Sequence, residues 1–440
     1  MGNWKQLILS TPQLLECYQQ MTVPSLKVSA GSDIVFEDLQ KEAVLAVIFL
    51  ARTLFDSLGM KIKYRGLDNL RGRRVAFVAN HQGGNLDALV IACILFAEKQ
   101  KTPFIPTSNR LLEAQIIGKF SEYLKYVGPF FIRTSFKDDE AYMTQVLEFM
   151  NAVLDARQYL LFFLEGDTSR GGKPRPPKRG LIKSLVKSPL VFCPISITYE
   201  SALNDTGIES KAFHVQDAVT NLTQRRVGNC YVTFGKCIDS EGAGVCHKQI
   251  TERLATAVYS EIPILTVDLI AMVLLDGDGL SLKNLTSKVE YLELYVKSCN
   301  LSLVTREVEK ALPALSHLVS LKGGRYYVLN AVVLNFYRNR AIHAIFDLAE
   351  PPTFLKYECC WRPSELQDNA MVRAMAVRAI SPLITSYQKV IAHIGSGRRN
   401  TKDVLSKLLI GQPCCTLDNI LQILSEMGVI RVQGHDVITL

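Results

Sequence analysis

The sequence predicts an α/β fold followed by an α-helical C-terminal domain, and two patterns carry this prediction. Between about residues 75 and 240, short apolar runs such as "VAFVA" and "YLLFFLEG" alternate with longer stretches of helical periodicity. This alternation is typical of a sheet flanked by helices. After about residue 262 strand signals nearly vanish, and segments such as "LTSKVEYLELYVKSC" repeat apolar residues at helical spacing.

Length and composition indicate a globular chain. It has 440 residues, 48% of them hydrophobic, which is enough to bury a large core and excludes a disordered protein. Charge-free apolar stretches such as "AVLAVIFLA" are far shorter than the roughly 20 residues needed to cross a bilayer, so we expect no spanning helix. Neither end shows a legible targeting signal. The eleven cysteines include no CxxC pair, which favours reduced thiols facing the cytosol.

We expect four regions along the chain. Residues 1–60 form an N-terminal helical region, in which 33–58 have the spacing of a helix with a broad apolar face. That face either packs on the core or lies on a membrane. Residues 61–262 form the α/β domain, and 263–400 form the helical domain. Residues 401–440 suggest two helices and a short β pair in a winged-helix-like layout.

Positive charge gathers in one part of the chain. The formal net charge is +8, which suits an anionic partner such as a phosphorylated substrate, coenzyme A, an anionic lipid or nucleic acid. The stretch 170–187 holds seven basic residues and no acidic one. A solvated loop and helix face would show the same pattern, so charge alone does not choose the partner.

The segment "NHQGGNLDAL" places His81 and Asp87 between the end of an apolar run and the start of a stretch with helical periodicity. A histidine abstracts a proton from an alcohol near neutral pH if a carboxylate holds its tautomer and stabilises the imidazolium. A polar loop that only forms hydrogen bonds would contain the same residues. Taken alone, the segment leaves both interpretations open.

Three further blocks follow the first. "GPFFIRT" ends an aromatic strand in Arg133, and "FFLEGDTSR" closes a strand with Glu165 and Gly166 before the basic stretch begins. The fourth block, "CPISITYE", predicts a strand whose proline requires an edge or end position. Strand ends are where α/β proteins present chemistry, so all four blocks are candidate site elements.

In this order, the four blocks resemble the motifs of the glycerolipid acyltransferases, most closely the glycerol-3-phosphate and dihydroxyacetone-phosphate acyltransferase branch. That branch has an H-x4-D block, a GxFFIRR-like block, FxEGxRSR and PISIxYE. "VTFGKCI" (232–238) and "NFYRNRAIHAIF" (335–346) resemble further elements of the branch, so the resemblance covers about residues 40–350. It implies an acyltransferase-type mixed sheet flanked by helices.

The resemblance implies transfer of a fatty acyl group from acyl-CoA, or acyl carrier protein, to a phosphorylated three-carbon acceptor in phospholipid synthesis. It implies no metal, and no cofactor apart from acyl-CoA as co-substrate. His81 would act as general base and Asp87 would orient it, as the carboxylate does in a hydrolase triad. The backbone around Glu165 and Gly166, or the helix N-terminus after Gly84, would stabilise the oxyanion.

Basic side chains would hold the phosphates, since the planar arginine fork suits them. For the acceptor phosphate the resemblance implies Arg133, Arg170 and Lys173. For coenzyme A phosphates or anionic lipid it implies Arg175, Lys178 and Arg179. We therefore expect peripheral binding to a membrane surface, either facing the cytosol or in an organelle.

The sequence departs from the branch in its first block. Five residues, not four, separate His81 from Asp87, and one extra residue inside a helix would turn the aspartate by about 100°. Glycines at 83 and 84 absorb the extra residue if it lies in the loop, which leaves Asn85 as N-cap and Asp87 in the first turn. Asn85 is the rival partner of His81 if they do not.

Two arginines of the branch are also replaced, by Thr134 and Thr168. Each charged contact contributes about 1.5–3 kcal/mol, so their loss would weaken the acceptor site or change the acceptor. Two hypotheses follow: an active acyltransferase with an altered acceptor site, or a weak or inactive relative that binds acyl-CoA, membrane or a protein. No nucleic-acid partner is expected, because the basic stretch lacks interleaved aromatic residues.

Overall fold

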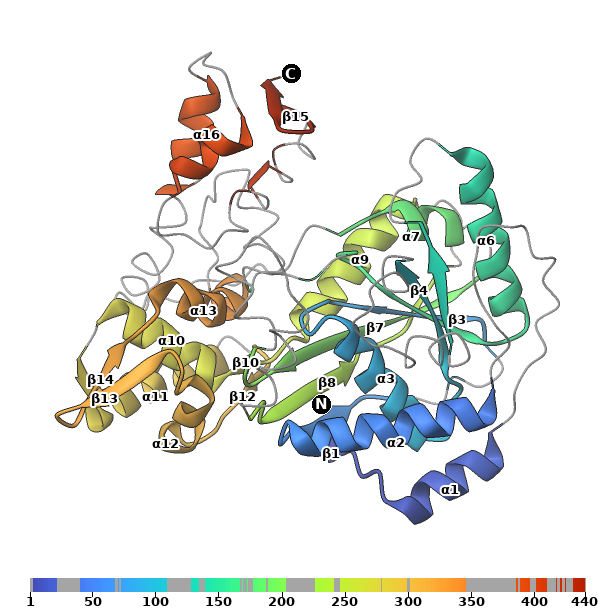
Figure 1. Cartoon of the computed structure of the whole chain (residues 1–440), viewed down its shortest axis with the longest axis horizontal. Coiled ribbons are helices and arrows are strands. Elements are labelled where there is room, and N and C mark those ends of the chain that lie inside the picture. Colours follow the sequence, from blue (N-terminus) through green and yellow to red (C-terminus); the bar gives the residue numbers. More distant parts are fainter. Residues whose placement is uncertain are drawn as a thin grey trace. The chain divides into compact units, whose positions relative to one another are not determined.

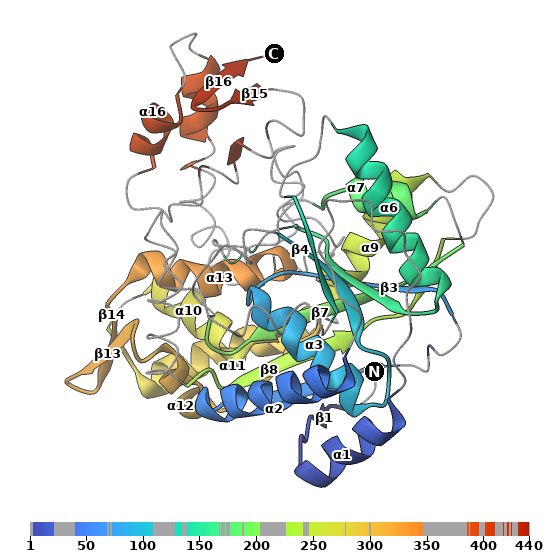
Figure 2. The ribbon, with the colours of Figure 1, turned by 45° about the vertical axis from the view of Figure 1, so that its right-hand side comes forward.

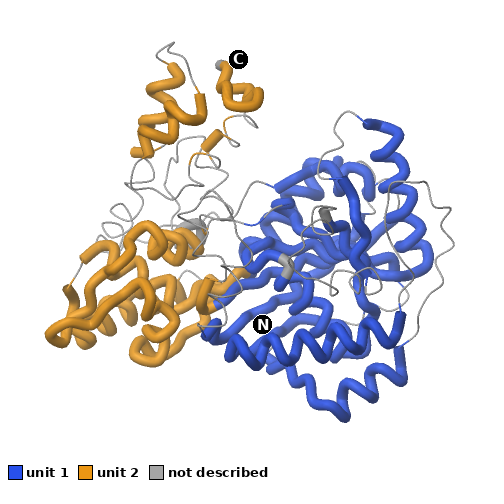
Figure 3. The backbone as a smooth tube through the Cα atoms, viewed as in Figure 1, with its two compact units in different colours: residues 1–168, 177–199, 222–261 blue, residues 169–176, 200–221, 262–440 orange. Residues whose placement is uncertain are grey.

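The chain divides into two compact units (Figure 3). Unit 1 comprises residues 1–168, 177–199 and 222–261, and unit 2 comprises 169–176, 200–221 and 262–440. The computed structural model describes residues 3–21, 40–67, 70, 73–108, 128–133, 139–166, 168, 172, 177–186, 189–202, 226–240, 246–277, 279–298, 301–345, 385–386, 388–395, 401–409, 417, 420–421, 424 and 430–439.

Within the described residues, unit 1 is built on a nine-stranded sheet in the order β1-β2-β8-β7-β3-β6-β4-β5, with β9 paired to β7 (Figure 1). β3 is parallel to β6 and β7, and β4 is parallel to β5 and β6, whereas β7 is antiparallel to β8. This confirms the predicted mixed sheet. The strands are β1 Lys5–Gln6, β2 Lys61–Arg65, β3 Val75–Ala79, β4 Pro103–Ser108, β5 Pro129–Ile132, β6 Tyr159–Phe163, β7 Val191–Tyr199, β8 Asn229–Phe234 and β9 Ile238–Asp239.

Helices cover both faces of this sheet (Figures 1 and 2). On one face α1, α2 and α3 pack together, and on the other lie α6, α7 and α9. All five residues of β3 are therefore buried, as in other parallel strands covered on both sides. The helices are α1 Thr11–Gln20, α2 Lys41–Ser57, α3 Asn85–Ala97, α6 Glu140–Asp155, α7 Gly180–Leu185 and α9 His247–Ser260.

Helix α2 shows that the apolar face predicted in the N-terminal region packs on the core. Its buried residues include Val44, Val47, Ile48 and Ala51, which recur at the spacing of one helical face. Core packing is thus confirmed for this face, while Leu50 and other large apolar side chains remain exposed. Residues 33–39, which were also predicted to be helical, lie outside the described residues. No helix in the described part of the chain is long and apolar enough to span a membrane.

Pro194 corrects one expectation. The proline was expected at a strand edge or end, but it lies inside β7, which pairs with strands on both sides. On one side, β9 pairs with β7 only at residues 191–192 and β8 pairs with it from Ile195 onward. Pro194 falls in the gap between these two partners, and its carbonyl accepts the Gly235 N–H at 2.8 Å. The missing N–H therefore interrupts no ladder there.

Unit 2 is mainly helical, as predicted, but it also contains short strands. Among them β11, β14 and β13 form an antiparallel sheet. Apolar periodicity did not predict this sheet, yet Gly323 and Gly324 at φ +55° and +71° form the tight turn that joins β13 to β14. The elements are β10 Ile264–Leu265, α10 Thr266–Asp276, β11 Leu280–Ser281, α11 Leu282–Ser298, β12 Leu303–Val304, α12 Val308–Ala311, the 3-10 helix η3 Leu312–Leu315, β13 Val319–Lys322, β14 Arg325–Val328 and α13 Ala331–Ile345.

The described part of the C-terminal tail has a small core of its own. Helix α16 (Lys402–Lys407) and the antiparallel pair β15 (Ile430–Gln433) and β16 (Asp436–Thr439) contribute to it. The predicted β pair is therefore present, and the winged-helix-like layout stays a prediction. The core residues are Val390, Ile394, Leu405, Leu409, Leu417, Ile420, Leu421, Leu424, Ile430 and Val437.

Candidate active site

The first sequence block forms the turn between β3 and α3. β3 ends at Ala79, and Asn80 continues it with its side chain. The Asn80 side-chain Nδ2 donates to the Ile197 carbonyl at 2.9 Å, and the Ile197 N–H donates to the Asn80 side-chain Oδ1 at 2.8 Å. The Asn80 side chain thus replaces the backbone of one further strand residue in pairing with β7. This pairing fixes the position at which the next residue, His81, leaves the sheet.

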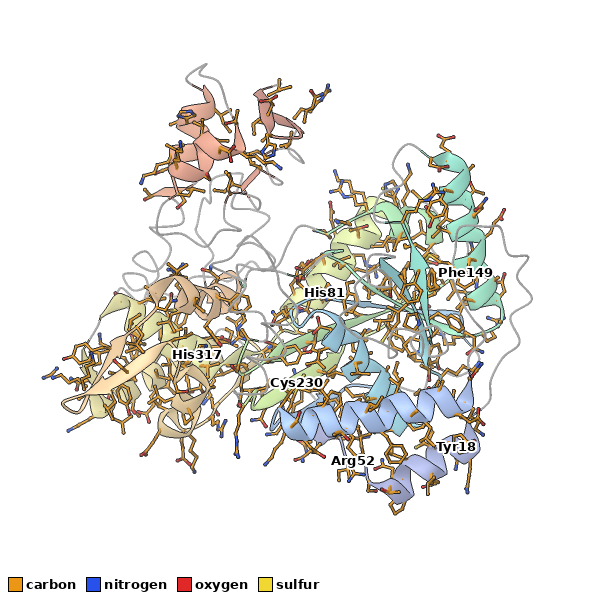
Figure 4. All side chains as sticks on the ribbon, viewed as in Figure 1. Tyr18, Arg52, His81, Phe149, Cys230 and His317 are labelled. Atoms are coloured by element: carbon orange, nitrogen blue, oxygen red, sulfur yellow. The ribbon has the colours of Figure 1, made fainter. Side chains whose placement is uncertain are left out.

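His81 and Asp87 meet in this turn. The His81 Nδ1 lies 2.8 Å from the Asp87 Oδ2, and His81 is labelled in Figure 4. The extra residue lies in the loop, as expected: Gly84 has φ +63° and ψ −140°, a conformation that glycine alone adopts readily. The N-cap is Gly84 and not Asn85, because this glycine conformation directs the chain into α3 one residue earlier than predicted. The Asn85 side chain lies outside the described part of the structure.

Asp87 is a fully buried carboxylate with a complete set of donors. Its side chain is 0% exposed. The Gln82 N–H donates to Oδ2 at 2.9 Å, and the Gly83 N–H lies 2.9 Å from both oxygens. Tyr199 donates its hydroxyl to Oδ1 at 2.6 Å. Because Asp87 is the third residue of α3, the helix N-terminus also favours its negative charge.

Tyr199 belongs to the fourth sequence block, but the sequence did not predict that its hydroxyl contacts Asp87. Burial, and next the Asp87 charge, raise the pKa of its hydroxyl well above the ordinary value, so the group stays a donor. Burial likewise raises the pKa of Cys230, the register partner of Tyr199 between β7 and β8; Cys230 is labelled in Figure 4. The length of the fourth block was the sequence signal for this role. The last pair between β3 and β7 is at Ile195, and β7 continues for four more residues to Tyr199, beyond the end of β3.

Glycine at position 83 is required by this packing. A Cβ added there would lie 2.7 Å from the Asp87 Oδ1 and 2.8 Å from the Tyr199 ring. Real side chains do not tolerate such distances, so any larger residue would push the carboxylate or the tyrosine away. The two adjacent glycines therefore serve different needs, Gly84 for backbone conformation and Gly83 for space.

The third block lies beside the turn because of strand register. Ala79 pairs with Phe163, so His81 and Glu165 both stand two residues beyond paired positions. The His81 N–H donates to the Glu165 Oε1 at 3.2 Å, and its ring stacks on Phe163 with centroids 4.0 Å apart. The buried Glu165 thus holds the His81 backbone, and the Phe163 ring packs on the imidazole.

Gly166 uses its backbone N–H within its own turn. That group donates to the Phe163 carbonyl at 3.1 Å, with the glycine at φ +65°. At the third block the Gly166 N–H is therefore already engaged, and both predicted sources of oxyanion donors stay predictions. The Gly84 N–H has no acceptor among the described residues.

The structure does not bring Arg133 beside His81. Arg133 follows β5, which lies three strands away from β3, and each strand spacing is about 4.8 Å. Its Nη1 donates to the Asp139 Oδ2 at 2.9 Å, and its guanidinium lies over the Tyr142 ring at 4.3 Å. A phosphate at Arg133 would have to share it with Asp139.

The basic stretch is only partly described. Lys178 lies against the third block, because its N–H donates to the Leu164 carbonyl at 2.8 Å and its side chain covers Gly166. Arg179 is the N-cap of α7 and is exposed. Thr168 is half-buried. Arg170, Lys173, Arg175 and Thr134 lie outside the described residues.

No group of three or more histidine, cysteine, aspartate or glutamate side chains that could hold a metal occurs in the described part of the chain. What the site does offer is proton transfer. With Nδ1 facing Asp87, the imidazole presents its other nitrogen, Nε2, which has no hydrogen-bond partner among the described residues.

Comparison with known proteins gives two kinds of similarity. Residues 61–198 match the family model described as acyltransferase. A glycerol-3-phosphate acyltransferase of Pseudomonas fluorescens (strain Pf0-1) is 26% identical over 345 residues, which are 66% of this chain and 40% of the relative. A glycerol-3-phosphate acyltransferase of Pseudomonas paraeruginosa is 27% identical over 198 residues, 41% of this chain and 23% of the relative. The chain thus spans less than half the length of these relatives.

Among solved structures, the crystal structure of the 1-acyl-sn-glycerophosphate (LPA) acyltransferase PlsC from Thermotoga maritima is similar at a TM-score of 0.35. The two chains are 16% identical, and the match covers 49% of this chain and 76% of that one. At this score the match adds nothing to the description of the sheet and the turn given above.

Proposed function

We infer the function from one premise: over residues 61–198 this chain is a member of the acyltransferase family, as its four sequence blocks predicted. We propose that it moves a fatty acyl group from acyl-CoA to the hydroxyl of glycerol 3-phosphate or dihydroxyacetone phosphate. The observation that carries the proposal is the 2.8 Å contact between His81 Nδ1 and Asp87 Oδ2 at a strand end. The names of the relatives support a glycerol phosphate acceptor.

His81 is the general base of the proposed reaction. Asp87 holds Nδ1 as the protonated nitrogen, so Nε2 takes the proton of the acceptor hydroxyl while that oxygen attacks the thioester carbonyl carbon. The tetrahedral intermediate then collapses, the carbon–sulfur bond breaks, and the proton passes from Nε2 to the leaving thiolate. No covalent acyl-enzyme is needed, because the acceptor itself is the nucleophile.

The N-terminus of α3 suits the negative oxygen of the tetrahedral intermediate. The half-buried Gly84 presents its N–H there without a competing acceptor in the described part of the chain. A donor already in place when charge develops stabilises the transition state more than the ground state. The positive end of the helix dipole adds to this effect.

Cationic residues of the basic stretch would bind the phosphates. We assign the acceptor phosphate to Arg170 and Lys173, and coenzyme A to Arg175, Lys178 and Arg179. Lys178 is the member whose contacts are described, and its position over Gly166 supports this assignment. Arg133 contributes to acceptor binding only if the phosphate displaces or shares Asp139.

We also propose peripheral binding to an anionic membrane surface. Leu50 and Leu54 of α2 and Leu15 of α1 are exposed, and such side chains insert into the interface of a bilayer. Co-sedimentation with vesicles of phosphatidylcholine and phosphatidylserine should fall as salt rises and fall further in Leu50→Ser/Leu54→Ser. Absence of the wild-type chain from the vesicle pellet at low salt would refute this part.

The decisive experiment measures thiol release from palmitoyl-CoA with glycerol 3-phosphate, dihydroxyacetone phosphate or unphosphorylated glycerol, and identifies the product by mass spectrometry. We expect release that depends on a phosphorylated acceptor and a monoacylated phosphate product. The rival hypothesis of an inactive binding protein rests on Thr134 and Thr168. It predicts that folded protein binds palmitoyl-CoA and turns over no acceptor.

A further inference from the structure

The imidazole of His81 has an aromatic ring lying nearly parallel to one of its faces. The centroid of the Phe163 ring is 4.0 Å from that of the imidazole, and the two ring planes are 14° apart. Strand register explains the contact, since Phe163 ends β6 and pairs with Ala79 at the end of β3, two residues before His81. Both rings belong to unit 1.

Close parallel stacking is not the arrangement that two neutral aromatic rings prefer. Both ring faces carry partial negative charge, so neutral rings favour offset or edge-to-face contacts with centroids about 4.5–7 Å apart. Phe77, also on β3, follows this preference: it meets Tyr159 edge-on at 5.4 Å and Phe234 edge-on at 6.1 Å. The stack of His81 on Phe163 is closer and flatter than either contact, so its electrostatic attraction is small while the imidazole is neutral.

Protonation of the imidazole changes the sign of this balance. A cation over the face of an aromatic ring, within about 6 Å of its centroid, is attracted by the negative charge of that face. In the proposed reaction the acceptor O–H bond breaks, an N–H bond forms at the His81 Nε2, and the imidazole ring becomes positively charged. The ring returns to neutral when the leaving thiolate takes the proton. The attraction to Phe163 is therefore strongest while the reaction is in progress.

The surroundings of His81 favour a strong contact of this kind. The His81 side chain is 15% exposed, so little water screens it. Its Nδ1 edge faces Asp87 at 2.8 Å, and its backbone N–H donates to Glu165. The carboxylate thus holds an edge of the imidazole and Phe163 covers a face. Cation–π contacts gain strength when water is excluded.

We propose that Phe163 is a positioning residue that stabilises the charged form of His81 through the face of its ring. This inference rests on the proposed function, because it requires His81 to accept a proton during turnover. It adds to the third sequence block a role that differs from the hydrogen bonds of Glu165 and Gly166. A contact that strengthens only as charge develops raises kcat and leaves substrate affinity nearly unchanged.

The test replaces Phe163 in the full chain by phenylalanine carrying one, two or three fluorine atoms. Fluorine withdraws electron density from the ring face and alters the shape of the ring little, so each atom weakens the attraction for a cation. We expect kcat for acceptor-dependent thiol release to fall stepwise, reaching roughly twofold to thirtyfold below wild type with three fluorine atoms. The KM values for palmitoyl-CoA and glycerol 3-phosphate should change little. A role in packing alone predicts no such trend.

Phe162 is the matched control for this series. It precedes Phe163 in β6, pairs with Val78, and is 4% exposed. Successive residues of a strand point to opposite faces of the sheet, so its ring lies on the other side from His81. The same fluorinated residues at position 162 should leave kcat unchanged. A flat series at position 163, or an equal decline at both positions, overturns the proposal.

Ordinary substitutions give a second comparison. Phe163→Leu keeps an apolar side chain and removes the aromatic face, so kcat should fall by a factor similar to that of the trifluorinated ring. Phe163→Tyr keeps the face and should retain most of the turnover. Wild-type kcat in a folded Phe163→Leu protein counts against the proposal. If Phe163→Leu does not fold, the fluorinated series decides, because it keeps the ring in place.

Failure of this inference and failure of the proposed function give different results. A wild-type chain without acceptor-dependent thiol release refutes both, whereas wild-type turnover with a flat series at position 163 refutes this inference alone. A measurement without turnover tests the stack itself. The ring current of Phe163 shields the His81 Cε1 proton, so Phe163→Leu should move its NMR signal downfield, with His81→Ala to assign it. An unmoved signal overturns the proposal.

Discussion

The turn from His81 to Asp87 in unit 1 and helix α13 in unit 2 each bury a full charge, and they compensate it differently. Asp87 is 0% exposed and receives hydrogen bonds from two backbone N–H groups, from Tyr199 and from His81. Arg338 is 4% exposed and is bonded to the neutral side chain of Asn339. The buried carboxylate thus has several donors, whereas the described partner of the buried guanidinium is one neutral amide.

The different surroundings of Asp87 and Arg338 indicate what each buried charge contributes. A buried carboxylate whose acceptor sites are all filled is a fixed part of the protein, and it acts by holding another group, here His81. A buried guanidinium whose described partner is a neutral amide lacks the ionic compensation that a carboxylate would give, so its burial costs the fold free energy. Changes in the two regions should therefore affect different measurements: turnover for the His81–Asp87 pair, and the free energy of unfolding for the arginines of α13.

The largest effect is expected from His81→Ala. Removing the proposed general base should lower the turnover number by about a hundredfold to ten-thousandfold, because the acceptor hydroxyl is a poor nucleophile when protonated. Acceptor-dependent thiol release measures this, with circular dichroism to show that the fold is kept. His247→Ala, at the first position of α9, is the control and should leave turnover unchanged. A folded His81→Ala protein with near wild-type turnover would refute the catalytic assignment.

The next effect separates the two arginines of α13. Arg340→Met leaves Asp268 buried without its cation, which should lower the free energy of unfolding by about 3–5 kcal/mol. Arg338→Met removes a buried charge that has no ionic partner among the described residues, so ligand-free stability should stay within about 0.5 kcal/mol of wild type or rise. Urea denaturation monitored by fluorescence compares them. Equal destabilisation by both substitutions would mean that Arg338 is held by an ionic partner after all.

A smaller effect is expected from Tyr199→Phe, which removes one donor from Asp87. A hydrogen bond to a charged group contributes about 1.5–3 kcal/mol, so turnover should fall by roughly tenfold to a hundredfold while the affinity for acceptor changes little. Tyr64→Phe is the control, since the wild-type Tyr64 hydroxyl donates to Glu98 and not to Asp87. A variant in which only stability changes, and turnover does not, would make Tyr199 purely structural.

The same tyrosine predicts a pH dependence of stability. Its pKa is raised in the folded state, so above about pH 10 the unfolded chain releases this proton and the folded chain retains it. Folding is then less favourable, and the stabilisation present below that pH is lost as pH rises. Tyr199→Phe should show a smaller loss between neutral and alkaline pH in the same urea titrations. Parallel curves for both proteins would contradict the role of this hydroxyl.

The smallest effect is expected from Thr168→Arg, which restores a charge that the acyltransferase branch carries in its third block. The apparent KM for glycerol 3-phosphate should fall several-fold with little change in kcat, because a remote phosphate contact strengthens ground state and transition state together. Thr168→Gln, which is larger than threonine but uncharged, is the control. If the charged and uncharged variants behave alike across phosphorylated acceptors, the acceptor phosphate does not reach this position.

Sequence by itself determined the parts of the site that depend on neighbours in the chain. The apolar run before His81 predicted β3, and the paired glycines predicted a loop able to return Asp87 to His81. These contacts span six residues, so local backbone conformation decides them. The alternation of apolar runs with helical stretches predicted the sheet, and the resemblance of the four blocks to acyltransferase motifs implied the family.

Only the tertiary structure decided which distant residues complete the charges. Tyr199 reaches Asp87 because β7 extends past β3, and Arg133 lies away from His81 because β5 is three strands from β3. Arg338 and Arg340 look equivalent in the sequence, yet the packing of α10 supplies a carboxylate to Arg340 alone. Strand order, register and helix contacts set these distances, and the energy of a buried charge depends on them and not on its neighbours in sequence.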